Sequence, residues 1–196
     1  MTYRYDERAA LVVVDVQNDF ADPDGSLSVA GGSDVVAVAN AEAVAARSAG
    51  ALVAFTQDWH PPDTPHFAKD GGAWPVHCVR DTWGAQLVDG LDVSESPVVR
   101  KGTEGEDGYS GFSVRDPQTG AESPTQLERL LRDHDVQRVV IVGLATDYCV
   151  KETALDAVRL GFTTVVLHDG IRAVEVDDGD GERAIAAMTA AGVQVS

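Results

Sequence analysis

Six short apolar runs, rich in β-branched residues, recur along the chain and limit its fold more than any other feature. They occupy residues 10–15, 51–58, 96–101, 138–144, 163–169 and 192–196. A strand with one face in solvent alternates apolar and polar residues, whereas these runs are almost continuously apolar. The pattern indicates strands buried on both faces, as in a parallel sheet covered by helices.

Helical patterns lie between these runs, at residues 34–50, 124–133, 147–161 and 178–192. Several begin at an Asp and end at a Gly, the residue types that favour the two ends of a helix. Strands that alternate with helices predict βαβ units. We therefore expect an α/β fold: three layers, α/β/α, around a Rossmann-like, mostly parallel six-stranded sheet. The length of 196 residues suits one domain spanning residues 1–196.

Charge and cysteine content exclude several classes of function. Asp and Glu total 32 against 15 Lys and Arg, and the net charge of -17 repels nucleic acids and anionic membranes. No apolar stretch approaches the roughly 20 residues that cross a bilayer, and the polar N-terminus lacks the layout of a secretory signal. Two cysteines are too few for a disulfide framework. We expect a cytoplasmic protein without nucleic acid or membrane partners; a homo-oligomer is compatible with the sequence.

Reactive side chains follow four of the apolar runs. In an open parallel sheet, ligands bind beyond the carboxyl ends of the strands. Asp15, Asp58 and Lys101 end three runs, and Cys149 follows a fourth, in the first turn of a predicted helix whose positive end favours a thiolate. Asp15 could accept the thiol proton and Lys101 could stabilise the charges. The alternative is an inert buried cysteine, an Asp that caps a turn and a solvated Lys.

The irregular segment at about residues 58–90 predicts a metal site, because loops of this length in a compact domain are usually functional. Asp58 and His60 are two residues apart, so on extended backbone they project to one face, and His66 and His77 could complete the set. One oxygen and two or three imidazoles suit Zn²⁺, Mn²⁺ or Fe²⁺. The alternative is histidine rings that only pack and form hydrogen bonds in a proline-rich loop. A second irregular stretch, residues 101–123, is expected to form another rim of the same cavity.

Five segments in this order resemble the isochorismatase-like cysteine hydrolases, and within them the nicotinamidase/pyrazinamidase group. The segments are LVVVDVQNDF, TQDWHPPDTPHF, WPVHCV, KGTEGEDGYSGF and VGLATDYCVKETALDAV. Together they cover almost the whole chain, and their length and order make the resemblance specific.

The resemblance implies a role for each matching residue. These are the catalytic Asp15, Lys101 and Cys149; the metal ligands Asp58, His60 and His77, with His66 in some members; the oxyanion-hole donors Ala145 and Cys149; and the ring-binding Phe20, Trp74 and Tyr109. A cis peptide before Ala145 would aim the two oxyanion-hole N–H groups at one point.

The implied activity is hydrolysis of nicotinamide, and of pyrazinamide, to the acid and ammonia through a thioester on Cys149, as part of NAD salvage. The implied cofactor is one divalent metal ion, zinc ahead of iron or manganese. Two alternatives remain: another cysteine amidohydrolase of the family, of the carbamoyl-amide type, and a non-catalytic binding module on the same fold. The intact Asp-Lys-Cys set argues against the second, and the full aspartate-histidine set argues against the first.

Overall fold

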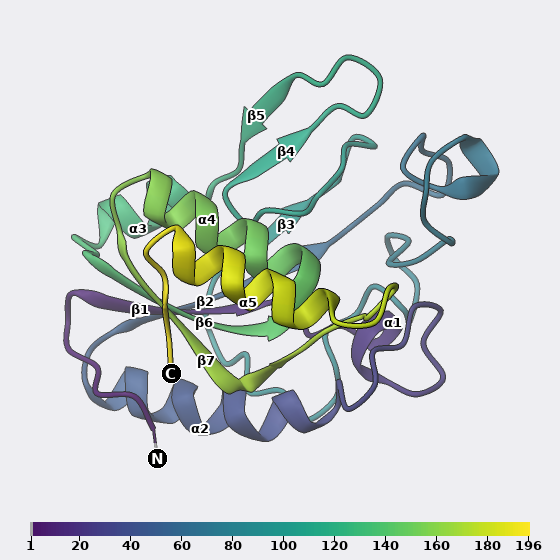
Figure 1. Ribbon diagram of the computed structural model, residues 1–196. Helices are drawn as coiled ribbons and strands as arrows, with labels where there is room; N and C mark the ends of the chain where they lie inside the picture. Colours follow the sequence, from purple (N-terminus) through teal and green to yellow (C-terminus); the bar gives the residue numbers. More distant parts are fainter. Residues whose placement is uncertain (1) are drawn as a thin grey trace.

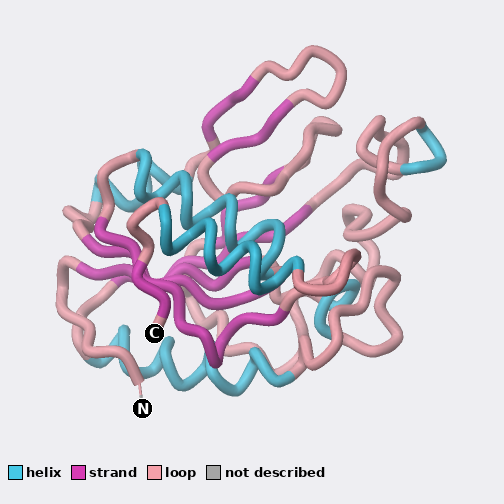
Figure 2. Tube along the Cα trace, viewed as in Figure 1, coloured by secondary structure: helices cyan, strands magenta, loops and turns pink. Residues whose placement is uncertain are grey.

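The computed structural model describes residues 2–196 and places a six-stranded sheet at the centre of the molecule (Figures 1 and 2). The strand order is β3-β2-β1-β6-β7-β8, and each neighbouring pair is parallel. The strands are β1 (Ala9–Val14), β2 (Leu52–Asp58), β3 (Val98–Lys101), β6 (Arg138–Leu144), β7 (Thr163–Arg172) and β8 (Gln194–Val195). The predicted Rossmann-like sheet is confirmed.

Helices cover both faces of this sheet. Helix α2 (Asp34–Ser48) runs along one face, and α3 (Leu127–Asp133), α4 (Lys151–Arg159) and α5 (Asp180–Ala190) lie on the other (Figure 1). This is the three-layer arrangement that the alternation of strand and helix patterns predicts.

Strand β1 shows why the apolar runs are continuous. Leu11 and Val13 belong to the core cluster that contains the buried residues of α2, whereas Ala10 and Val12 belong to the cluster beneath α3, α4 and α5. All four side chains are almost completely removed from solvent. A polar residue at any of these positions would lose its hydration without gaining a partner.

Helices α2, α4 and α5 each end shortly before a glycine with positive φ, as predicted. Helix α4 ends before Gly161, which has a φ of 86°, and Phe162 N–H then bonds to the carbonyl of Ala157 at 2.9 Å. Only glycine adopts this left-handed conformation without steric cost, so Gly161 stops the helix and turns the chain into β7.

Several local features differ from the sequence expectations. The helix expected from residue 124 begins at Leu127, because Pro124 ends β5 (Glu122–Pro124), which pairs with β4 (Ser113–Arg115) in an antiparallel hairpin that projects from the body (Figure 1). The Thr125 hydroxyl then accepts the N–H of Leu127 at 3.1 Å and starts α3. The helix expected from residue 147 opens as a π-helical turn, η2 (Thr146–Val150), before α4.

Two short elements and one strand extension were absent from the sequence expectations. Helix α1 (Asn18–Ala21) follows β1, and the 3-10 helix η1 (Ala68–Asp70) lies in the long segment after β2. Strand β7 continues to Arg172, past the expected end at residue 169, beyond a register irregularity opposite Ile141 and Gly143. Among residues 2–196, no helix is both long and apolar enough to cross a membrane.

Candidate active site

The reactive side chains meet at the carboxyl edge of the sheet. From β1 the chain builds outward through β2 to β3, and from β6 it builds in the opposite direction, so the topological switch point lies between the neighbours β1 and β6. Ligands of open α/β sheets bind at such points. Asp15 directly follows β1, and Cys149 lies in η2 after β6, with both residues buried.

Lys101 contacts each of the other reactive side chains at this edge. It is the residue opposite Asp58 in the register of β2 and β3, and its side chain is completely buried. Its Nζ lies 2.7 Å from Asp15 Oδ2, also contacts Asp58 Oδ1 and the carbonyl of Gly108, and lies 3.7 Å from Cys149 Sγ. One ammonium is therefore the shared counter-charge of two buried carboxylates beside the thiol.

The charges of this group set its proton affinities. Burial raises the pKa of Asp15 to about 6, against the opposing effect of Lys101. Burial disfavours the Lys101 ammonium, yet the carboxylates of Asp15 and Asp58 hold its pKa well above the usual value. Burial likewise raises the pKa of the Cys149 thiol, although Lys101 favours the thiolate. The resting thiol is therefore protonated near neutral pH and needs a base.

Asp15 is placed to be that base. Its Oδ1 accepts a 2.6 Å hydrogen bond from the Thr56 hydroxyl, and the bond fixes the carboxylate. Its Oδ2 contacts Lys101 without hydrogen-bond geometry, which leaves that oxygen able to accept a proton. One carboxylate oxygen of Asp15 and the sulfur of Cys149 lie within 4.8 Å of each other.

The turn that carries Cys149 begins with a cis peptide between Leu144 and Ala145, at the position expected from the resemblance. After it, the carbonyl of Ala145 accepts the N–H groups of Tyr148 and Val150 at 3.1 and 3.0 Å. Ala145 and Cys149 both line the pocket described below.

Three histidines form a compact cluster next to the catalytic group. One ring nitrogen from each of His60, His66 and His77 lies within 4.8 Å of the others, and all three residues are buried. The rings of His60 and His66 stack with centroids 4.6 Å apart. Asp58 Oδ2 lies 3.8 Å from Nε2 of His60, so one carboxylate oxygen borders the cluster.

The hydrogen bonds of these imidazoles fit a metal centre. Nδ1 of His66 pairs with Asp107 Oδ1 at 2.6 Å, and Nδ1 of His77 pairs with the carbonyl of Pro75 at 2.8 Å, which leaves Nε2 of each ring available as the ligand atom. Metal-bound histidines usually have such a partner on the other nitrogen. Neither nitrogen of His60 has a partner among the described residues, although the ring is fully buried. The ring nitrogens that face the cluster are therefore available as ligands for a cation.

Protonation also favours a cation at this cluster. Burial lowers the pKa of His60 to about 3 and lowers the pKa of His77, so both rings are neutral at physiological pH. Burial alone would raise the pKa of Asp58, but Lys101 and His60 keep it below the usual value. Neutral imidazoles and an ionised carboxylate are the protonation states that a divalent metal ion binds.

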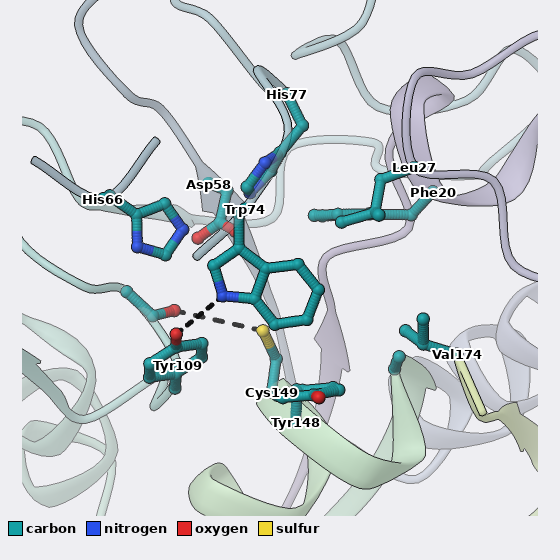
Figure 3. A pocket seen from close by; sticks show the side chains of 12 residues that line it. Phe20, Leu27, Asp58, His66, Trp74, His77, Tyr109, Tyr148, Cys149 and Val174 are labelled. Carbon is teal, nitrogen blue, oxygen red and sulfur yellow. Dashed lines mark hydrogen bonds between the residues drawn. The ribbon is translucent and has the colours of Figure 1, made fainter. Parts of the chain in front are cut away.

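An aromatic pocket lies between the cluster and the thiol (Figure 3). In this view Phe20 and Leu27 lie on the side opposite His66 and Tyr109, with Cys149 and Tyr148 below. The indole N–H of Trp74 donates to the Tyr109 hydroxyl at 2.7 Å. The structure thus brings the three aromatic residues expected from the sequence to the same cavity as Asp58 and Cys149.

Several contributors were missed by the sequence reasoning. Leu27, Tyr148 and Val174 line the pocket, and Thr56 and Asp107 hold Asp15 and His66. Tyr148 was within reach of that reasoning, because it immediately precedes the proposed nucleophile. No pattern in the sequence indicates Val174 as a pocket residue, since only the fold of the segment after β7 brings it to the pocket.

Comparison with known proteins agrees with this arrangement. The isochorismatase domain model matches residues 9–196. The nicotinamidase of Escherichia coli K12 is 38% identical, and the alignment covers 93% of this chain and 92% of that protein. The pyrazinamidase of Pyrococcus horikoshii, solved in complex with zinc, superposes with a TM-score of 0.85 at 38% identity over 96% of this chain and 98% of that one.

A third relative was solved with a small molecule. The PnC1 protein of L. infantum in complex with nicotinate superposes with a TM-score of 0.88 at 36% identity, covering 100% of this chain and 96% of that one. Domain model, sequence and structure agree over almost the whole chain, and the chain belongs to the isochorismatase domain family.

Proposed function

We propose that this protein hydrolyses nicotinamide to nicotinate and ammonia, and pyrazinamide likewise. The observation that carries the proposal is the position of the Cys149 thiol beside a buried Asp-Lys pair, in an aromatic pocket that is also lined by two members of the histidine cluster. The nicotinamidase and pyrazinamidase relatives support the same substrates. An aromatic slot suits a flat ring, and the thiol suits attack on its carboxamide.

Acylation begins when Asp15 accepts the proton of Cys149. With a pKa of about 6, Asp15 is ionised near neutral pH and is still basic enough to take that proton in the transition state. The sulfur attacks the carboxamide carbon, and the N–H groups of Ala145 and Cys149 stabilise the resulting oxyanion. Asp15 then passes its proton to the amide nitrogen, the C–N bond breaks, and ammonia leaves a thioester on Cys149.

Deacylation repeats these roles with water. Asp15 accepts a proton as a water oxygen attacks the thioester carbon, and the same N–H groups hold the second oxyanion. The C–S bond breaks, the proton on Asp15 returns to the Cys149 sulfur, and nicotinic acid leaves and gives its carboxyl proton to the released ammonia or to water, which yields nicotinate. Lys101 keeps its charge throughout and stabilises the two buried carboxylates and the transient thiolate.

A divalent cation would be held by Asp58, His60, His66 and His77, and the imidazole-rich donor set favours zinc ahead of iron or manganese. When bound, it supplies a Lewis acid beside the pocket that can coordinate a pyridine nitrogen or a water. The hydrogen bond between Asp107 and His66 supports His66 as a full ligand in this chain. Phe20, Trp74 and Tyr109 would orient the ring for the attack.

The test is ammonia release from nicotinamide, pyrazinamide, benzamide, N-carbamoylsarcosine and an aliphatic amide. We expect kcat/KM to be highest for nicotinamide and pyrazinamide, because both offer a ring nitrogen meta to the carboxamide. Benzamide has the same shape and scissile bond without that lone pair, and sites built around a polar contact reject analogues that lack it. A preference for N-carbamoylsarcosine, or equal values for nicotinamide and benzamide, would contradict the assignment.

A further inference from the structure

A buried carboxylate outside the proposed ligand set connects two loops of the site. Asp19, in α1, is 8% exposed. Its Oδ1 accepts the backbone N–H of Ser26 at 3.0 Å, and its Oδ2 accepts the backbone N–H of Cys78 at 2.6 Å. Each oxygen thus holds a different segment: Ser26 precedes Leu27 of the pocket, and Cys78 follows the histidine His77.

Cys78 fixes the positions of two histidines through its backbone. His77 is its neighbour in the chain, and its carbonyl accepts the backbone N–H of His60 at 3.0 Å. Its φ of 45° lies in the left-handed region, which residues with a side chain adopt at a steric cost and keep only when their surroundings hold them there. The bond from Cys78 N–H to Asp19 is such a restraint.

The carboxylate of Asp19 is itself held in place. Its backbone N–H donates to the carbonyl of Gly84 at 3.0 Å, and a Cβ atom at Gly84 would lie 2.1 Å from Asp19 Oδ2. The backbone of Gly84 therefore closes the space around the carboxylate. A displaced carboxylate would release the Cys78 backbone.

From these contacts we infer that Asp19 is a positioning residue for the histidine cluster. It holds the backbone of Cys78 in the left-handed conformation, and so aligns the imidazoles of His60 and His77 toward a common point. Outer partners of metal ligands usually bind the imidazole itself; here the restraint acts on the backbone that carries two ligands. The inference rests on the proposed metal site, and its readout is metal affinity rather than activity.

The experiment measures zinc affinity of the metal-free full chain by competition with a chromophoric chelator. Asp19→Asn keeps the size of the side chain, but its amide nitrogen cannot accept the second backbone N–H. We expect zinc to bind about 10-fold to 100-fold more weakly, the usual effect of losing an outer partner. Circular dichroism before zinc addition verifies that the variant is folded.

Asp147 provides a matched control. It is also buried, and its two oxygens accept the backbone N–H groups of Val174 and Glu175 at 3.0 and 2.9 Å. The segment that it holds carries no proposed metal ligand. Asp147→Asn should therefore leave zinc affinity at the wild-type value, although it removes the same number of hydrogen-bond acceptors as Asp19→Asn.

A second change tests the route through Cys78. Glycine adopts positive φ without steric cost, so adding Cys78→Gly to Asp19→Asn should recover part of the lost zinc affinity. If Asp19→Asn does not fold, Gly84→Ala displaces the same carboxylate by crowding and should weaken zinc binding instead.

The outcomes separate this inference from the metal site itself. Wild-type chain that binds no zinc would overturn the metal site, and the role of Asp19 with it. Wild-type binding that is retained by Asp19→Asn would overturn the role of Asp19 alone. An equal loss in Asp147→Asn, or no recovery in the double variant, would show that Asp19 acts only as a general support of the fold.

Discussion

Replacing Lys101 with methionine tests whether the stability of the fold depends on the buried ammonium group of Lys101. Lys101 is fully buried and contacts the carboxylates of Asp15 and Asp58 and the carbonyl of Gly108. Methionine fills much of the same volume but leaves two carboxylates buried without a counter-charge. Removing one partner of a buried ion pair costs about 3–5 kcal/mol, chiefly because the remaining charge is uncompensated.

The expected loss converts to a change in melting temperature. For a chain of this size each kcal/mol shifts the Tm by about 2–4 °C, so Lys101→Met should lower it by roughly 6–20 °C. The melt is followed by circular dichroism at pH 8 on metal-free protein, because a bound cation would neutralise Asp58.

Lys69 is the matched control. It also contacts two carboxylates, those of Asp63 and Asp70, but its side chain is 40% exposed. Solvent screens such pairs and they contribute little to stability. Lys69→Met should melt close to the wild type.

The pH dependence of the stability difference between Lys101→Met and the wild type is a further test. In the wild type the pKa of Asp15 is about 6, and Lys101 holds it down against burial, so in Lys101→Met the Asp15 pKa lies higher and lowering the pH from 8 to 5 adds a proton to this stranded carboxylate. The stability gap between Lys101→Met and wild type should therefore narrow as the pH falls. A Tm for Lys101→Met that matches Lys69→Met, or a gap that widens toward pH 5, would refute the reasoning.

Three further results are expected. Cys149→Ala should abolish ammonia release while preserving the Tm, and mass spectrometry should find iodoacetamide on Cys149 before Cys78, which is buried away from the pocket. In wild type, log kcat/KM should fall with about unit slope below the Asp15 pKa of about 6, because protonated Asp15 cannot accept the thiol proton; a flat acid limb would contradict this. Trp74→Ala should lower kcat/KM for nicotinamide, pyrazinamide and benzamide alike, since stacking is independent of the ring nitrogen.

The sequence predicts the sheet well because strands that are buried on both faces are almost continuously apolar. The run at residues 138–144 coincides with β6, since each of its central residues packs against a helix layer. The β4 and β5 hairpin was missed because its strands are three residues long and mostly exposed, and such short exposed strands carry no apolar pattern.

The residues of the site likewise fall into those that the sequence predicts and those that it does not. Asp15, Asp58 and Lys101 stand where strands end, a position that the apolar runs mark in the sequence. The partners of these residues could not be predicted, because Thr56 and Asp107 reach Asp15 and His66 through contacts between residues about 41 positions apart. Backbone acceptors such as the carbonyl of Gly108 are independent of residue type and leave no trace in the sequence.

The pairing of β1 with β6 makes the chemistry a late product of folding. These neighbours come from opposite halves of the chain, and contacts between such distant segments are slow to form because a long loop must close first. Until β6 pairs with β1, Cys149 is separated from Asp15, and the incompletely folded chain has no base beside the thiol. The site is therefore complete only after β1 and β6 have paired, and activity should not return during refolding before the central sheet has closed.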